Sequence, residues 1–316
     1  MSIDNKEKKL ISIVTPTYNE EDCIEDLYCK IKDITEQVSD YKFEIIVIDN
    51  DSKDKTQEIL KKIASKDRYF KVILNNRNFG HIRSPYYGIL QSHADAVIYL
   101  ASDFQNPPEL IPNFIEYWEK GFKLVMATKS KSKESFIFSS LRKIYYRILD
   151  NVSDISVIKD STGFGLYDCE VIKELRKINE PYPFMRGLIC DLGYDVKTID
   201  FTQPERKKGI TKNNFYTLYD IGMLGIISHS KTPIRLAALL GFMIGIISFL
   251  IGVIYFILKI IYWESFPMGI APLIIGLFFF IGLQFIFIGV IGEYIGSIHT
   301  YSQNRPLVVE KERINF

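Results

Sequence analysis

The chain has 316 residues, enough for one domain with a substantial core plus an appendage. Its 39 Lys and Arg residues nearly cancel its 38 Asp and Glu residues, so the bulk charge does not point to nucleic-acid binding. Most charged residues lie before Arg235, whereas Ile, Leu, Phe and Gly dominate the last quarter. This shift in composition predicts a soluble domain followed by a membrane segment.

The cysteines and the N-terminal residues indicate the cellular compartment in which the first domain lies. The four cysteines have neither metal-like nor redox-like spacing, and we expect free thiols in a reducing compartment: Cys23, Cys29, Cys169 and Cys190. Residues 1–9 are polar and mixed in charge, and the apolar stretch after them is short, unlike a signal peptide. We therefore expect the first domain to remain in the cytoplasm.

Short β-branched runs alternate with helical patterns in the first hundred residues. We expect four buried strands, at residues 10–15, 43–48, 71–74 and 96–100. Apolar residues at helical spacing predict helices around residues 27–34, 59–63 and 86–92. Ser52 is a candidate cap for the second of these helices. This alternation predicts an α/β fold with a mostly parallel, Rossmann-like sheet and helices on both faces.

Polar clusters stand where three of these strands end: Thr17–Glu20, Asp49–Ser52 and Ser102–Asn106. In a doubly wound sheet the ligand lies beyond the carboxyl ends of the strands, so these clusters predict the binding site. At such a position, the carboxylates of Asp49 and Asp51 can accept hydrogen bonds from a base or a ribose. The same residues also suit a simple turn that caps the next helix.

The third cluster has oxygen donors two residues apart. Asp103 and Gln105 would suit a Mg²⁺ or Mn²⁺ ion that bridges a diphosphate. Pro107 and Pro108 would stiffen the loop and begin a helix. The residues alone equally allow an acidic loop without a metal.

Two long uncharged runs, Leu236–Leu258 and Ser265–Gly292, follow near the C-terminus. At about 1.5 Å per residue each can cross a hydrocarbon core of roughly 30 Å. Core helices are the alternative, but no amphipathic partner remains nearby to bury so much apolar surface. The connection between the runs is short, so we expect an antiparallel hairpin with spans at about 234–260 and 267–295.

Basic residues flank this hairpin: Lys231 and Arg235 before it, and Arg305, Lys311 and Arg313 after it. The positive-inside rule then keeps both termini and the first domain in the cytoplasm. Apolar residues in 213–230 predict either an interfacial amphipathic helix or a plain connecting helix. The expected organisation is a cytoplasmic domain, a juxtamembrane helix, the hairpin and a cytoplasmic tail, at 1–212, 213–233, 234–298 and 299–316.

Four segments carry a family resemblance: Ser12–Glu21, Ile48–Asp54, Arg77–His81 and Asp103–Glu109. In this order they resemble family 2 glycosyltransferases, which have the GT-A fold. The last two are similar to the polyprenyl-phosphate subgroup, which includes bactoprenol glucosyltransferases and dolichol-phosphate mannose synthases. The resemblance covers nearly the whole chain, including the pair of membrane helices. It implies transfer of a hexose, with UDP as the expected carrier, to undecaprenyl phosphate at the cytoplasmic face of the inner membrane.

The resemblance also implies roles for individual residues. The nucleotide-sugar would be bound by Pro16, Tyr18, Glu20, Asp49, Asp51, Ser102 and Asp103. The cation would be Mg²⁺ or Mn²⁺, held by Asp103 and Gln105. Phosphates would be held by Lys129, Arg206 and Lys212, with Gly209 letting the loop close over the donor. The candidate catalytic residues are Asp103, Asp160 and Arg186, and Arg186 precedes the acceptor helix.

The chain departs from the family pattern at Ala101, Gly163 and Gly165, where the family has Asp, the proposed catalytic Asp and Arg. Either a nearby group such as Asp160 supplies the base, or none is needed. A phosphate monoester is mostly a dianion at neutral pH, because its second pKa is about 6, and so it is already a nucleophile. We therefore expect in-line attack with inversion and without an essential protein base.

Two other interpretations remain. A non-catalytic membrane scaffold that binds nucleotide-sugars is supported by Ala101 and Gly163. A polysaccharide synthase of the same fold would carry a Gln-x-x-Arg-Trp motif, which this chain lacks, and would need more than two spans. The expected partners are the donor, the polyprenyl phosphate, a flippase for the product and, through the small residues Gly241, Gly245 and Gly252, a homo-oligomer. Those glycines could equally serve only the hairpin.

Overall fold

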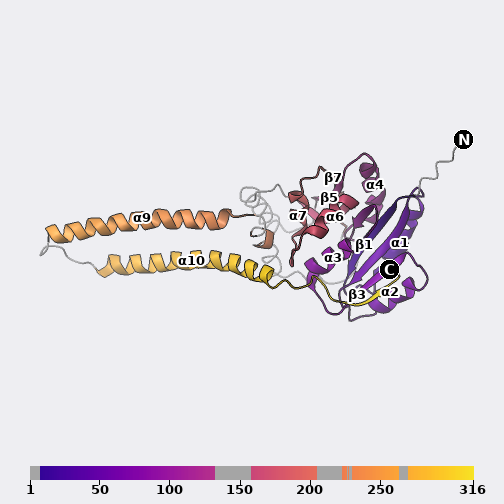
Figure 1. The fold of residues 1–316 in the computed structure, drawn as a ribbon, viewed down its shortest axis with the longest axis horizontal. Coiled ribbons are helices and arrows are strands. Elements are labelled where there is room, and N and C mark those ends of the chain that lie inside the picture. Colours follow the sequence, from indigo (N-terminus) through magenta and orange to yellow (C-terminus); the bar gives the residue numbers. More distant parts are fainter. Residues whose placement is uncertain (1–7, 132–157, 205–222, 226, 228–229, 263–269) are drawn as a thin grey trace.

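The protein consists of an α/β domain from which two long helices project on one side (Figure 1). The computed structural model describes residues 8–131, 158–204, 223–225, 227, 230–262 and 270–316. The domain is built on one sheet, and the C-terminus returns to it beside β3 after the two helices (Figure 1).

Four parallel strands form the centre of the sheet: β1 (Leu10–Thr17), β2 (Lys42–Asp49), β3 (Phe70–Asn75) and β4 (Ala96–Tyr99). They lie in the order β4-β1-β2-β3, and β1 pairs in parallel with both β2 and β4. The four strands predicted from the sequence are confirmed, with bounds that differ by one or two residues. Their β-branched runs are buried on both faces, as parallel strands covered by helices require.

Four further strands complete the sheet: β5 (Leu124–Lys131), β6 (Ser161–Asp168), β7 (Val196–Thr202) and β8 (Glu310–Ile314). The eight strands lie in the order β7-β5-β6-β4-β1-β2-β3-β8. Strand β6 is antiparallel to β4 and β5, and β8 is antiparallel to β3, while β5 and β7 are parallel. The sheet is therefore mixed around a parallel centre.

Helices cover both faces, as the sequence predicted. One face carries α1 (Ile24–Glu36), α2 (Thr56–Ala64) and α4 (Ile111–Glu119), the last preceded by the short 3-10 helix η1 (Pro108–Leu110). The other face carries α3 (Gly80–Leu90), α6 (Cys169–Lys177) and α7 (Met185–Asp191). Each face of the sheet has its own hydrophobic core beneath these helices. Neighbouring residues of β1 alternate between the two cores, with Ile13 on the α1, α2 and α4 side and Val14 on the α3, α6 and α7 side.

The start of α2 corrects one detail of the sequence analysis. The helix begins at Thr56, whose N–H donates to Asp54 Oδ1 at 3.0 Å. Ser52 lies too early in the chain to cap it. Its hydroxyl instead donates to Asp49 and accepts the Asn19 N–H at 2.8 Å. Ser52 therefore joins the ends of β1 and β2.

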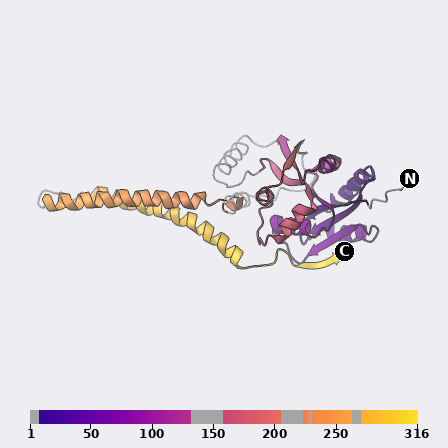
Figure 2. The ribbon, with the colours of Figure 1, turned by 45° about the horizontal axis from the view of Figure 1, so that its top comes forward.

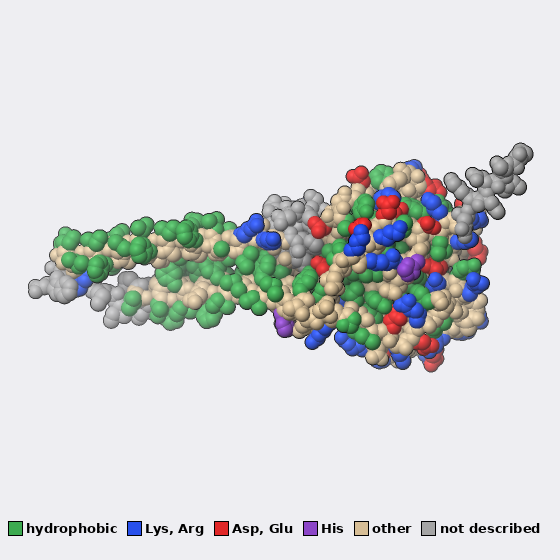
Figure 3. Space-filling model, viewed as in Figure 1, with side chains coloured by type: hydrophobic (Ala, Val, Ile, Leu, Met, Phe, Trp, Pro, Cys, Tyr) green, Lys and Arg blue, Asp and Glu red, His purple; other side chains and the backbone are tan. Residues whose placement is uncertain are grey.

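The two projecting helices are α9 (Thr232–Ile261) and α10 (Ile270–Ser302), which run side by side (Figures 1 and 2). Thr232–Ile261 and Gly276–Ser302 reach mean hydropathies of 2.6 and 2.0, and none of either window is buried. Figure 3 shows this surface as apolar along both helices. Both are long and apolar enough to cross a membrane. The predicted juxtamembrane helix lies mostly outside the described residues, apart from helical positions 223–225 and 227.

The segment expected to be a tail is built into the domain. After α10 the chain buries Val308, and β8 then pairs with β3, so that Val72 faces Ile314 and Leu74 faces Glu312. The side-chain amide of Asn315 donates to the carbonyls of Ala64, Asp67 and Phe70 at 2.8, 3.2 and 2.9 Å. The last residues thus hold the α2–β3 connection.

We expect Asn315→Ala to lower the free energy of unfolding by about 1–3 kcal/mol, because these carbonyls lose their side-chain donor. Thermal unfolding of the full chain in detergent measures it. Lys311→Ala is the matched control, since Lys311 is exposed on β8, the strand that precedes Asn315, and its removal should change little. An equal loss in both variants would contradict the prediction.

Candidate active site

The parallel pairing brings the loops after β1, β2 and β4 to one edge of the sheet. Thr17 lies opposite Asp49, and the Asn50 N–H donates to the Thr17 carbonyl at 3.0 Å. On the other side of β1, the Leu100 N–H donates to the Val14 carbonyl at 3.1 Å. The three polar clusters therefore meet at the predicted edge.

The loop after β1 is hydrogen-bonded to the turn after β2. The Asn19 side chain accepts the Lys53 N–H at 2.8 Å, and the Glu20 N–H donates to Thr56 Oγ1 at 2.9 Å. Three predicted residues of the nucleotide-sugar site lie here, Pro16 in β1 and Tyr18 and Glu20 in the loop. The contacts place the loop beside the turn that holds Asp49 and Asp51. Thr17, the last residue of β1, has a buried hydroxyl with no hydrogen-bond partner among the described residues.

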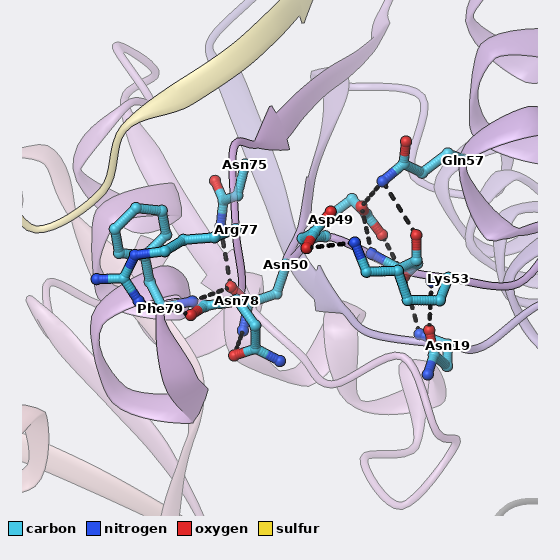
Figure 4. A network of polar contacts seen from close by, with 11 residues as sticks. Asn19, Asp49, Asn50, Lys53, Gln57, Asn75, Arg77, Asn78 and Phe79 are labelled. Atoms are coloured by element: carbon cyan, nitrogen blue, oxygen red, sulfur yellow. Dashed lines mark hydrogen bonds and ion pairs between the residues drawn. The ribbon is translucent and has the colours of Figure 1, made fainter.

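Asp49 is fully buried at the end of β2 (Figure 4). It accepts the Ser52 N–H at 3.0 Å, the Ser52 hydroxyl and the Gln57 side-chain amide at 2.8 Å. Burial raises the pKa of Asp49 above its usual range and Asp51 acts in the same direction, while the hydrogen bonds from Ser52 and Gln57 oppose the rise. Asp49 thus holds the turn in its shape, the simpler role that its sequence context also allowed.

Asp51 has a left-handed backbone with φ of 66° and lies 2.7 Å from the Lys53 ammonium. The Lys53 side chain is mostly exposed, so this ion pair contributes little stability by itself. The Asp51 side chain is 19% exposed, whereas Asp49 is fully buried.

Asn50 joins a third loop to the same turn (Figure 4). Its amide nitrogen donates to Asn78 Oδ1 at 2.9 Å and to the Gly80 carbonyl at 3.2 Å. Its oxygen accepts the Asn75 amide at 3.1 Å and the Phe79 N–H at 2.8 Å. These hydrogen bonds therefore hold the motif Arg77–His81 at the same edge of the sheet as the loops after β1 and β2. Sequence reasoning found the motif but missed this anchor, because nothing in Asn50 itself distinguishes it from an ordinary turn residue.

The acidic loop after β4 is closed by its own side chains. The Ala101 N–H donates to Asn106 Oδ1 at 2.9 Å, and the Gln105 N–H donates to Asp103 Oδ1 at 3.1 Å. Ser102 is buried within the loop. The predicted helix start at Pro107-Pro108 is confirmed, because η1 begins at Pro108.

The acidic loop after β4 offers few ligands for a metal ion. Among the described residues, no three His, Cys, Asp or Glu side chains are grouped to hold a metal ion. Asp103 and Gln105 provide one carboxylate and one amide oxygen. This set fits Mg²⁺ or Mn²⁺ only as an ion that takes its remaining ligands from substrate phosphates and water, which is usual for Mg²⁺.

A cavity of about 120 Å³ lies on the α3 and α7 side of β4. The predicted residue Arg186 lines it, together with Tyr99 and Gly163. Burial raises the pKa of Tyr99 to about 12, with Asp103 acting in the same direction and Arg186 against it. Asp103 of the acidic loop and Arg186 therefore both influence the pKa of the Tyr99 phenol, which remains protonated at neutral pH. His81 and Thr162 also line the cavity and were not predicted.

The other predicted residues lie elsewhere. Asp160 has φ of 56° in the turn before β6, and its carbonyl accepts the Lys129 N–H at 3.1 Å. These two residues adjoin each other, but Asp160 does not line the cavity. Arg206, Gly209 and Lys212 lie outside the described residues.

The family model for "Glycosyl transferase family 2" matches residues 12–176, just over half of the chain. The chain belongs to this family. It is 33% identical over 299 residues to YkcC, an uncharacterized glycosyltransferase of Bacillus subtilis, covering 94% of this chain and 92% of YkcC. It is 31% identical over 302 residues to the bactoprenol glucosyl transferase of Shigella phage SfV, covering 95% and 98%.

Solved structures are more distant. Glucosyl-3-phosphoglycerate synthase from Mycobacterium tuberculosis, crystallised with Mn²⁺ and UDP, is 19% identical with a TM-score of 0.47. The match covers 69% of this chain and 78% of that one. Family membership and the mixed sheet around a parallel centre confirm the predicted GT-A fold.

The two glycines at which this glycosyltransferase departs from the family pattern differ in their surroundings. A Cβ on Gly165 would lie 2.3 Å from the Val125 carbonyl oxygen, so no side chain fits there. A Cβ on Gly163 would have Tyr99 as its nearest neighbour, at 3.8 Å, although φ is +87°. Close strand packing requires the first glycine, whereas only backbone conformation favours the second.

We expect Gly165→Ala to destabilise the domain by about 3 kcal/mol or more, because backbone atoms must move to admit the methyl group. Gly193→Ala is the matched control, since Gly193 has φ of +72° with no atom within 4 Å of the added Cβ. Thermal unfolding of both variants separates the clash from the cost of positive φ. Equal losses of stability in the two variants would show that the close contact between β5 and β6 does not exclude a side chain at Gly165.

We expect Asp49→Asn to weaken nucleotide binding about tenfold or more, because the new amide group must lie against Ser52 or Gln57, which donate hydrogen bonds there. Calorimetric titration with UDP and GDP measures the change. Glu58→Gln is the control, since Glu58 is exposed on α2. Unchanged affinity in Asp49→Asn would show that this turn does not shape the nucleotide site.

Proposed function

We propose that this glycosyltransferase moves a hexose from a nucleotide-sugar, with UDP as the expected carrier, to undecaprenyl phosphate at the cytoplasmic face of the membrane. The observation that carries the proposal is the extent of the match to a bactoprenol glucosyl transferase. It covers 95% of the chain and therefore includes the apolar helices as well as the nucleotide edge. A relative that shared only the GT-A domain would say nothing about a lipid acceptor.

The donor would lie across the carboxyl edge of the sheet. Pro16, Tyr18 and Glu20 would line one side of the nucleotide, and the turn held by Asp49 would present Asp51 to the base or ribose. The loop of Ser102 and Asp103 would then face the diphosphate. The hydrogen bonds between the loop after β1 and the turn after β2 support the first part of this arrangement, because they fix both segments before any ligand binds.

The acceptor phosphate would enter the cavity beside Arg186. As a dianion it needs no base: one of its oxygens attacks the anomeric carbon, the bond to the diphosphate oxygen breaks, and the nucleoside diphosphate leaves with inversion at that carbon. Arg186 would offset the charge of the incoming phosphate, with Lys129, Arg206 and Lys212 as further phosphate ligands. The position of Asp160 outside the cavity lining supports a mechanism without a protein base.

Asp103 and Gln105 would hold Mg²⁺ or Mn²⁺ in this scheme. Such an ion neutralises charge on the leaving diphosphate. The protein itself would position the acidic loop through the Asn106 and Asp103 hydrogen bonds.

The membrane arrangement is part of the proposal. With α9 and α10 as an antiparallel hairpin, both termini and the GT-A domain would lie in the cytoplasm. Return of β8 to the sheet supports this, because it requires the C-terminus and the domain to lie on the same side. A product made inside and used outside would need a flippase as a partner.

The test is transfer of labelled sugar from a panel of UDP- and GDP-sugars to undecaprenyl phosphate by purified protein in detergent, with Mg²⁺, Mn²⁺ or EDTA. We expect a chloroform-soluble product from one donor and none with EDTA. Absence of lipid product with every donor, despite nucleotide binding, would favour the non-catalytic alternative.

Two carboxylate variants separate the assigned roles. We expect Asp103→Asn to lower kcat about 100-fold or more, because it removes the carboxylate that faces the leaving diphosphate. Asp160→Asn should keep most of the wild-type rate. If Asp160→Asn abolished turnover while donor binding remained intact, the mechanism without a base would be wrong.

A further inference from the structure

Three arginines outside the proposed reaction site meet where α10 joins the domain. The guanidinium carbons of Arg77 and Arg83 lie 4.1 and 5.4 Å from the centre of the Phe79 ring. Arg83 also donates from Nη2 to the carbonyl of Pro306, the residue after Arg305. The loop before α3, the first turn of α3 and the segment after α10 thus bring three positive charges together.

Nothing in the described part of the chain neutralises this cluster. None of the three arginines forms an ion pair with another described residue, and Arg83 Nε is buried without a partner there. Burial lowers the pKa of Arg83, and the charges of Arg77 and Arg305 lower it further. Arginines stay charged in proteins, so the repulsion persists and favours the binding of an anion.

The cluster lies at the junction between the apolar helices and the domain. Helix α10 ends at Ser302, and Arg305 follows three residues later. Three residues extend about 10 Å at most, so the cluster lies on the side of the domain from which the two helices project (Figure 1). Figure 3 shows Lys and Arg side chains where the apolar helices meet the domain.

The chemistry of the cluster suits phosphate. A guanidinium group can donate two parallel hydrogen bonds to phosphate oxygens. Contact with the Phe79 ring restricts two of the three side chains, which reduces the entropy lost when they bind a ligand.

We propose that Arg77, Arg83 and Arg305 form a binding site for the phosphate group of a membrane lipid. The lipid is either an anionic phospholipid or a polyprenyl phosphate, and both present phosphate oxygens at the surface of a bilayer. His81 and Ile82, between Arg77 and Arg83 in the chain, line the cavity of the candidate active site. A lipid phosphate held here therefore also fixes the domain with that cavity near the bilayer surface.

The experiment measures binding of fluorescent phosphatidylglycerol to the full-length protein in a neutral detergent. Arg77→Gln and Arg305→Gln are the main variants, because both side chains are exposed and their removal spares the core. Arg68→Gln is the matched control, an exposed arginine just before β3, at the end of that strand away from the donor edge. Arg83 holds Pro306, so Arg83→Lys is tested separately with a thermal-unfolding check.

We expect Kd to rise about fivefold for each main variant and about 25-fold when both are combined, from roughly 1 kcal/mol per basic residue near a lipid surface. Arg68→Gln should bind as the wild type does. Equal Kd values for the wild type and the double variant would overturn the proposal.

Competition identifies the source of the phosphate. Short-chain phosphatidylglycerol, farnesyl phosphate and short-chain phosphatidylcholine are each used to displace the probe. Stronger displacement by either anionic lipid than by phosphatidylcholine, lost in the double variant, supports the site and names its ligand. Displacement that is equal for all three lipids overturns it. Because no turnover is measured, this result is independent of the proposed sugar transfer.

Discussion

Parallel pairing of β1 with both β2 and β4 is the constraint on which the site depends. It places Asp49 opposite Thr17 and brings the loop of Asp103 to the same edge. Helices on both faces exclude water from these strands, so polar groups gather only where the strands end. A shift of one residue in either pairing would turn buried side chains to the opposite face.

Side-chain hydrogen bonds then convert this edge into an ordered site. Asn50 uses its amide nitrogen and oxygen for contacts with β3 and with the loop before α3. Ser52 and Asn19 join the first two loops in the same way. Buried amides that are fully hydrogen-bonded stabilise one geometry, and a loop fixed beforehand loses little entropy when a nucleotide binds.

The C-terminal strand attaches the end of α10 to the domain. Strand β8 pairs with β3, and Arg83 on α3 holds Pro306, so the chain after α10 is attached along the domain. Tyr301 near the end of α10 also donates to Glu180 at 2.9 Å. These contacts restrict how the domain can tilt relative to α10, which would matter for the proposed transfer to a lipid acceptor.

The sequence by itself determined the parallel centre of the sheet, the acidic loops at its edge and the two apolar helices. Each depends on local patterns: β-branched runs, the residues just after a strand, and unbroken hydropathy. Only the tertiary structure decided the partners of Asn50, the close contact that excludes a side chain at Gly165, the strand β8 and the meeting of Arg77, Arg83 and Arg305. These depend on contacts between residues up to more than 200 positions apart, and a short charged strand such as Glu310–Ile314 has no hydrophobic pattern to reveal it.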